Sequence, residues 1–283
     1  MKAALGISVL LGTTLAATAQ QPTFSSRVEA VRVDVLVMDR GQIVRGLRPE
    51  DFEVRDEGVL QDVELVRLEQ LPVNVVLGLD VSDSVSGERL KHLQGAGDTL
   101  LQRLAGDDRA ALLTFSHIVR LRQELTGNIG SIRQALASVS PSGQTALVDG
   151  TYGAIALAGS DVGRSLLIVF SDGVDTASFL SPEVVLQSAR RSDVVVYGIA
   201  MRSRISPTFL RSISEMTGGS VLEVESTRDL SQTFLRILEE FRQRYLLSFS
   251  PRGVSPTGWH RLEVRVKGRR GTVTARAGYQ AGR

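Results

Sequence analysis

The chain has 283 residues, enough for one large domain or two smaller ones, and its 42% hydrophobic and 23% charged residues are typical of a folded globular protein. The net charge of +2 gives no reason to expect nucleic-acid binding. The sequence has no cysteine, which excludes disulfides, thiolate metal sites, cysteine nucleophiles and a lipid-anchored cysteine.

Residues 1–19 have the features of a secretory signal peptide. Lys2 supplies an early positive charge, an apolar stretch covers residues 3–17, and Ala17-Thr18-Ala19 forms a small-x-small cleavage pattern. A helix needs about 20 apolar residues to span a bilayer, and this stretch is shorter. The alternative interpretation is an uncleaved anchor or a buried helix. We therefore expect a mature chain that begins at Gln20, has no transmembrane segment, and is periplasmic, secreted or surface-associated.

Both ends of the mature chain are rich in predicted strands. Residues 20–70 include VEAVRVDVLVMD, in which apolar and polar residues alternate, and residues 241–283 include YLLSFSP, HRLEVRVKG and TVTARAGY. Neither end has enough strands for a stable sheet by itself. The sequence therefore predicts one small β-sandwich built from residues 20–70 and 241–283, with the middle of the chain inserted between its halves.

The middle of the chain, residues 71–240, alternates strand and helix patterns. Such alternation predicts an α/β fold with a doubly wound, mostly parallel sheet. DRAALLTFS and IVRLRQEL are almost adjacent, so they predict a hairpin and one antiparallel edge strand. The other strand patterns are VNVVLGLD, SLLIVFSD, DVVVYGIA and GGSVLEV, and the helical patterns cover about 86–105, 130–138, 146–159, 182–192, 206–217 and 228–243.

Oxygen-bearing side chains gather where three of these segments end or begin. Asp80, Ser82 and Ser84 follow a buried strand, Thr145 opens a helix after a Ser/Gly loop, and Asp172 follows the strand LLIVFS. Ligands of open α/β sheets bind beyond the carboxyl ends of the strands, where these loops meet. Carboxylate and hydroxyl oxygens suit Mg²⁺, Mn²⁺ or Ca²⁺ rather than Zn²⁺ or Cu²⁺. The sequence thus predicts a divalent cation site.

The motifs DVSDS (80–84), SGQTAL around Thr145 and SDG around Asp172 resemble a complete metal-ion-dependent adhesion site of von Willebrand factor A domains. GLRPEDFEVRDEG and YLLSFSP…GYQ are similar to the flanks of a bacterial family of exported von Willebrand A-like proteins first described in Acidobacteria. The resemblance implies a Rossmann-like fold in which Ser82, Ser84 and Thr145 donate hydroxyls to the metal, whereas Asp80 and Asp172 act largely through water. It also implies that an acidic residue of a partner completes the metal's coordination.

Simpler interpretations compete with this one. A serine or aspartate after a strand is a common helix cap, and only the joint presence of Thr145 and Asp172 favours a metal. Asp83 and Asp175 are expected to be solvated loop charges, and Asp149 is expected to orient a loop by hydrogen bonding. The histidines His92, His117 and His260 are not expected to be ligands. The basic residues Arg261, Arg265, Lys267, Arg269, Arg270 and Arg276 predict a solvated strand face or, alternatively, a surface for an anionic partner.

The sequence carries no motif that supports an enzyme. It has no G-x-x-x-x-G-K-[ST] loop, no G-x-S-x-G elbow, and a serine at position 82, where a phosphotransfer enzyme would need a second carboxylate. We therefore expect an exported module that captures a partner's Asp or Glu carboxylate through a bound cation. The alternative is a structural or scaffold envelope protein in which the metal only stabilises the fold, and the β-sandwich or basic C-terminal strands bind the partner. The oligomeric state stays open.

Overall fold

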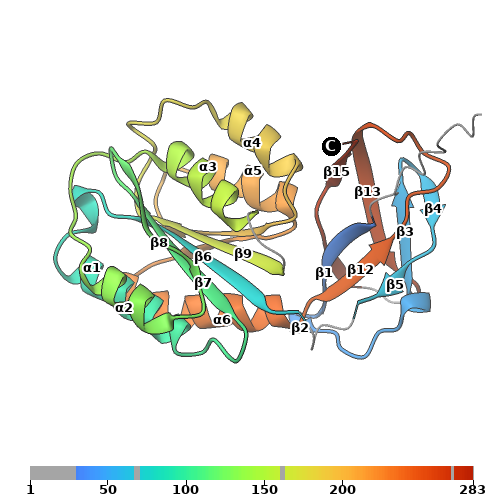
Figure 1. Cartoon of the computed structure of the whole chain (residues 1–283), viewed down its shortest axis with the longest axis horizontal. Coiled ribbons are helices and arrows are strands. Elements are labelled where there is room, and N and C mark those ends of the chain that lie inside the picture. The colour runs from blue at the N-terminus through green and yellow to red at the C-terminus, as the bar shows by residue number, and fades with distance from the viewer. Residues whose placement is uncertain (1–29, 67–70, 160–162, 269–270, 283) are drawn as a thin grey trace, which may run out of the picture.

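The computed structural model describes residues 30–66, 71–159, 163–268 and 271–282. The predicted signal peptide, residues 1–19, and the predicted N-terminus at Gln20 lie outside these ranges. The described residues form an α/β unit beside two smaller antiparallel sheets, which Figure 1 shows on its right-hand side.

Six strands form the sheet of the α/β unit. Neighbouring strands run parallel except for the last two, β7 and β8, which pair in the antiparallel direction at one edge. The predicted mostly parallel sheet with one antiparallel edge strand is therefore confirmed. In spatial order the strands are β11 (Val221–Val224), β10 (Val195–Met201), β9 (Arg164–Ser171), β6 (Val73–Asp80), β7 (Arg109–Phe115) and β8 (Val119–Thr126).

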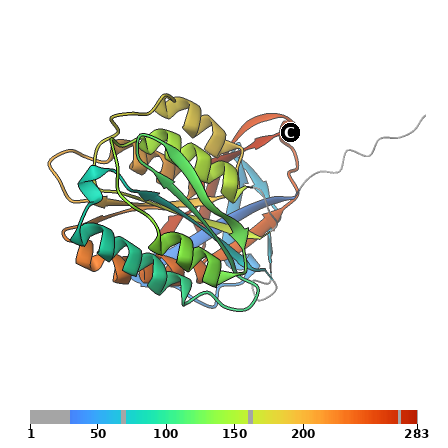
Figure 2. The same ribbon diagram turned by 60° about the vertical axis from the view of Figure 1, so that its left-hand side comes forward.

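Helices cover both faces of this sheet, as Figures 1 and 2 show from two directions. Every residue of β6 is buried, because its side chains alternate between two hydrophobic clusters. Leu77 and Leu79 pack with α1 (Glu88–Leu101), α2 (Ile129–Ala137) and α6 (Leu230–Arg242). Val76 packs on the other face with α3 (Leu147–Ala158), α4 (Pro182–Arg190) and α5 (Thr208–Thr217). In the described ranges every helix is too short or too polar to span a bilayer.

The two smaller sheets each contain strands from both ends of the chain. In the first, β1 (Val31–Asp39) pairs with β12 (Tyr245–Phe249), β14 (Thr272–Thr274) and β2 (Gln42–Ile43), and β12 also pairs with β5 (Glu64–Leu65). In the second, β13 (Gly258–Val266) lies between β3 (Phe52–Asp56) and β15 (Gly278–Ala281), and β4 (Val59–Gln61) follows β3. Apolar residues of both sheets, Val33 and Val54 among them, belong to one buried cluster.

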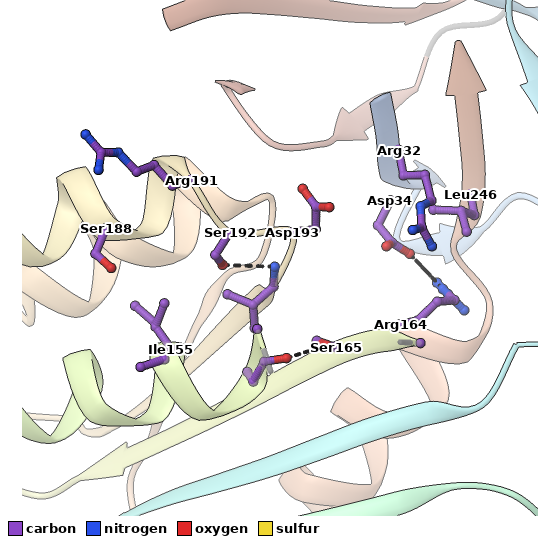
Figure 3. Close-up of a pocket in the computed structure, with 15 residues that line it drawn as sticks. Arg32, Asp34, Ile155, Arg164, Ser165, Ser188, Arg191, Ser192, Asp193 and Leu246 are labelled. Atoms are coloured by element: carbon purple, nitrogen blue, oxygen red, sulfur yellow. Dashed lines mark hydrogen bonds and ion pairs between the residues drawn. The ribbon is translucent and has the colours of Figure 1, made fainter. Parts of the chain in front are cut away.

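A buried ion pair joins the α/β unit to the first of these sheets. The Arg164 side chain at the start of β9 and the Asp34 side chain of β1 are 3% and 10% exposed, and Arg164 Nε donates to Asp34 Oδ1 at 3.0 Å. Arg164 Nη2 also donates to the Phe241 carbonyl at 3.1 Å. Figure 3 shows the pair on one side of the cleft between the two units.

The structure corrects the interpretation of the basic C-terminal residues as one solvated strand face. Arg261 and Arg265 are largely exposed, but Arg276 is buried and joins the smaller sheets to the α/β unit. Its Nη1 donates to Asp193 at 2.6 Å, and its Nη2 donates to the Ser192 carbonyl at 3.0 Å. The pattern of residues in a sequence cannot show that another unit packs against Arg276. Arg269 and Arg270 lie outside the described ranges.

Replacing Asp34 with asparagine should destabilise the protein strongly, because Arg164 would keep a buried charge with no counter-ion. Breaking a buried ion pair from one side typically costs about 3–5 kcal/mol. As a control, Asp62→Asn removes one partner of the exposed Asp62–Arg252 pair and should cost less than about 1 kcal/mol. Urea unfolding monitored by circular dichroism measures both variants. Equal, small changes in the two variants would show that the buried pair does not hold the units together.

Candidate metal centre

The predicted site residues lie at one edge of the sheet, where β6 and β9 both end. These strands are parallel neighbours, with Leu79 opposite Phe170, so Asp80 and Ser171 leave the sheet side by side. The loop before α3 reaches the same edge, because Ser142 N–H donates to the Val81 carbonyl at 2.8 Å. In Figure 1 this edge is at the left-hand end of the sheet, away from the two smaller sheets.

Asp80 is fully buried and anchors the site. Its Oδ1 accepts the Ser82 backbone N–H at 2.9 Å, and its Oδ2 accepts the Ser171 hydroxyl at 2.7 Å. Burial raises the pKa of Asp80, and the nearby charge of Asp172 raises it further, although the hydrogen bonds from Ser171 and Ser82 oppose these effects. The surroundings of Asp80 thus favour its neutral form, unless a nearby positive charge stabilises the ionised carboxylate.

Ser82, Ser84 and Asp172 form a continuous chain of hydrogen bonds. The Ser82 and Ser84 hydroxyls share a hydrogen bond of 3.0 Å, and the Ser84 hydroxyl donates to Asp172 Oδ1 at 2.6 Å. The spacing of two residues between the serines places both hydroxyls on the same side of the loop. The side chain of Asp172 is fully covered by its neighbours.

Thr145 faces this chain from the loop before α3. Its backbone is fixed, since its carbonyl accepts the N–H groups of Thr176 and Ala177 at 2.8 and 3.0 Å. Its hydroxyl oxygen points towards the loop after β9, because a Cβ built on Gly173 would lie 3.8 Å from it. That hydroxyl makes no hydrogen bond to any residue that the structure describes, although Thr145 is only 6% exposed.

The structure therefore brings together all five predicted residues: Asp80, Ser82, Ser84, Thr145 and Asp172. Three hydroxyls and two carboxylates form a donor set for a hard divalent cation, and the unpartnered Thr145 hydroxyl has an oxygen free for one. Among the described residues there is no group of three or more His, Asp or Glu side chains that could hold a metal. A metal site at this edge would therefore depend on the hydroxyl ligands Ser82, Ser84 and Thr145 in addition to its two carboxylates.

The sequence analysis missed Arg89, which also belongs to this edge. Arg89 lies in the first turn of α1, and its Nη1 donates to Asp172 Oδ2 at 2.8 Å and to the Ser84 carbonyl at 3.1 Å. The only sequence signal is its position, one helical turn beyond the serines. No sequence pattern connects it with Asp172, which is 83 residues away in the chain.

Other expected roles near the site had mixed outcomes. Asp149 orients a loop as predicted, because its carboxylate accepts the N–H groups of Phe179 and Leu180, each at 2.9 Å. The interpretation of Asp175 as a solvated charge is wrong, since it is half-buried and accepts the Ser178 hydroxyl at 2.5 Å. Asp83 is exposed.

The histidines lie elsewhere or are engaged with neighbouring residues. His92 shares a hydrogen bond of 2.9 Å with Thr227. His260 is buried in β13, where its Nδ1 bonds Asp56 Oδ1 at 2.8 Å and Tyr279 donates to Asp56 Oδ2 at 2.6 Å. Burial raises the pKa of Tyr279, and the hydrogen bond and charge of Asp56 raise it further. These contacts give His260 a structural role in the smaller sheets.

Comparison with known families identifies the α/β unit. The family model of the von Willebrand factor type A (VWA) domain matches residues 74–236, more than half of the chain. The chain belongs to the VWA domain family. The matched range contains all five predicted site residues and Arg89.

Relatives of known sequence are distant and longer. The inter-alpha-trypsin inhibitor heavy chain H2 of Mus musculus is 25% identical over 180 residues, which covers 58% of this chain and 19% of that protein. A protein of Synechocystis is 24% identical over 178 residues, covering 60% of this chain and 42% of its own length. This chain therefore matches less than half the length of either relative.

Solved structures share the VWA fold. Proximal thread matrix protein 1 of the mussel byssus superposes with a TM-score of 0.56 and 19% identity over 65% of this chain and 49% of its own, in a structure with a zinc-occupied metal-ion-dependent adhesion site. The PilB minor pilin of Streptococcus sanguinis superposes with a TM-score of 0.51 and 14% identity, covering 62% of each chain. At these identities the similarity establishes the fold alone.

Replacing Asp80 with asparagine should stabilise the metal-free VWA domain at neutral pH. The pKa of the Asp80 carboxyl group is raised in the folded state, so its ionised form lowers the free energy of unfolding. This loss of stability is present above the folded-state pKa and disappears as the pH falls through that pKa. In chelator at pH 7 the Asp80→Asn melting temperature should exceed the wild-type value, and the difference should shrink towards pH 4. Asp83→Asn, in the exposed part of the same loop, should change little. A lower melting temperature for Asp80→Asn at pH 7 would contradict this.

Proposed function

We propose that this chain is an exported protein-binding module for adhesion or assembly, which captures a partner's Asp or Glu carboxylate through a bound divalent cation. Asp80, Ser82, Ser84, Thr145 and Asp172 would hold the cation. The observation that carries the proposal is the convergence of these side chains from three loops, with a Thr145 hydroxyl that makes no hydrogen bond to a described residue.

The donor set supports capture of an anion. Ser82, Ser84 and Thr145 would bind the cation directly, and Asp80 and Asp172 would act largely through water. Neutral hydroxyls leave most of the cation's charge unbalanced at short range, so an incoming carboxylate gains a direct charge-assisted bond. We propose Mg²⁺, Mn²⁺ or Ca²⁺ on the basis of the oxygen ligands. Zinc is a further candidate, because the mussel protein was solved with zinc at its corresponding motif.

An exposed aromatic side chain in the loop that also carries Asp172 supports a protein partner. Phe179, in the loop after β9, is 96% exposed, and Asp149 fixes its backbone by accepting its N–H. Val174 in the same loop is 51% exposed. Aromatic anchors beside a polar contact are typical of protein interfaces. An exposed phenyl ring gives no advantage in binding a small inorganic anion.

The rest of the chain is proposed to present this site outside the cytoplasm. Residues 1–19 would act as the signal peptide, residues 71–240 would form the VWA domain, and residues 20–70 and 241–283 would form one β-sandwich domain. Strand pairs between the two ends of the chain and one shared apolar cluster support the β-sandwich. We propose ligand capture rather than catalysis, because the described site holds no positioned general base besides carboxylates that are already hydrogen-bonded.

Divalent cations should raise the melting temperature of the wild-type protein. A ligand that binds only the folded state adds about 2.7 kcal/mol of stability at a concentration of 100 Kd. Asp80→Ala and Thr145→Ala should abolish the response to Mg²⁺ or Mn²⁺, whereas Ser86→Ala, an exposed hydroxyl in the same loop, should preserve it. Differential scanning fluorimetry with and without chelator measures the shift. An undiminished response in Asp80→Ala and Thr145→Ala would refute the site assignment.

Partner capture should depend on both the cation and Ser84. Loss of one coordinated contact at an interface typically costs a few kcal/mol, so affinity should fall by about two orders of magnitude or more. The experiment is a pull-down from native envelope proteins, followed by binding measurements on the recovered partner in Mg²⁺, in chelator and with Ser84→Ala, with Ser86→Ala as the control. Equal partner affinity in Mg²⁺, in chelator and with Ser84→Ala would show that the metal is structural and that the partner binds elsewhere. The basic C-terminal strands would then be the first candidate for the binding face.

A further inference from the structure

Arg89 is the only cationic side chain that the described structure shows bonded to a predicted cation ligand. Its guanidinium is tethered through one nitrogen, Nη1, which donates to Asp172 Oδ2 and to the Ser84 carbonyl. The side chain is 53% exposed, whereas that of Asp172 is fully covered. Arg89 therefore sits on the solvent side of Asp172.

The other donors of this guanidinium are open. Nε and Nη2 make no hydrogen bond to any described residue, so their N–H groups are available to an outside acceptor. A guanidinium presents its donors in a planar fork that matches a carboxylate. The tether to Asp172 and Ser84 holds this fork in place before any partner arrives, which reduces the entropy lost on binding.

Arg89 also changes the charge that the site offers. A divalent cation with the carboxylates of Asp80 and Asp172 would be neutral overall, and Arg89 adds one positive charge. Because Arg89 pairs with Asp172, that carboxylate attracts the cation less strongly. The same charge attracts an incoming carboxylate. The two effects have opposite signs, so they can be separated by experiment.

We propose that Arg89 is a specificity-determining residue, which forms the second contact to the partner's carboxylate and weakens cation binding as a consequence. One carboxylate oxygen binds the cation, and the other accepts from the free edge of Arg89. This inference rests on the proposed function of the site. It favours a carboxylate over a carboxamide or a hydroxyl, since each of the latter offers only one oxygen and no negative charge.

Two measurements on the full mature chain test the proposal. The first is Mn²⁺ alone, titrated calorimetrically into the wild type, Arg89→Gln, Arg89→Lys, Lys91→Gln and Asp80→Ala. The second is acetate, titrated into the Mn²⁺-loaded proteins and followed by water-proton relaxation, which falls when a ligand displaces water from Mn²⁺. Lys91→Gln is the matched control, because Lys91 lies in the same first turns of α1 and pairs with Glu88 on the surface.

Arg89→Gln should bind Mn²⁺ on the order of tenfold more tightly and acetate on the order of tenfold more weakly than the wild type. Arg89→Lys keeps the charge but not the planar fork, so it should show near-wild-type Mn²⁺ affinity and intermediate acetate affinity. Lys91→Gln should match the wild type in both titrations.

Three results would overturn the inference. Unchanged Mn²⁺ and acetate affinities in Arg89→Gln would refute the role of Arg89 while leaving the metal site intact. If Lys91→Gln changed the Mn²⁺ and acetate affinities as much as Arg89→Gln, general surface charge would explain the effect and Arg89 would have no specific role. Wild-type protein that binds Mn²⁺ no better than Asp80→Ala would overturn the proposed function together with this inference.

Discussion

The buried carboxylate of Asp80 is the constraint on which the candidate site depends. It ends a strand whose residues are all buried, and it is held by hydrogen bonds from the Ser82 backbone and the Ser171 hydroxyl. These bonds fix the directions in which the chain leaves β6 and β9. A buried carboxylate with only neutral hydrogen-bond donors is unfavourable, and a bound cation is the simplest way to compensate it.

The loop that carries Thr145 is positioned by the backbone rather than by the site itself. Gly143 accepts the Asp83 N–H at 2.9 Å, and its φ of +72° favours glycine. A Cβ at this position would lie 2.0 Å from His117 Nδ1, so the exposed His117 side chain would have to move if Gly143 were replaced. The site can keep its geometry when a ligand hydroxyl is removed.

The candidate site and the smaller sheets occupy opposite ends of the α/β unit. Strand β9 contacts both: Arg164 at its start pairs with Asp34 of β1, and the Ser171 hydroxyl at its end donates a hydrogen bond to Asp80. A partner at the cation would therefore approach from the side away from the two smaller sheets (Figure 1). The buried pair Arg164–Asp34 and the contact of the buried Arg276 with the more exposed Asp193 hold the two parts of the described molecule in one arrangement.

Sequence patterns predicted what depends on short-range order and missed what depends on distant contacts. The sheet, its antiparallel edge strand and its helices follow from hydrophobic periodicity, and the grouping of Asp80 and Asp172 follows from the ends of parallel strands. Arg89 escaped because only the folded structure places it beside Asp172. Arg276 was misinterpreted because its burial arises from packing between two units.

The most direct test of this account is to locate the cation. Crystals grown with Mn²⁺, with diffraction measured near the manganese absorption edge, give an anomalous signal that identifies the ion independently of the protein. The account predicts one strong peak within coordination distance, about 2.0–2.3 Å, of the Ser82, Ser84 and Thr145 hydroxyl oxygens. A Mn²⁺-saturated crystal with no peak at these hydroxyls, or with its peak elsewhere on the chain, would contradict it.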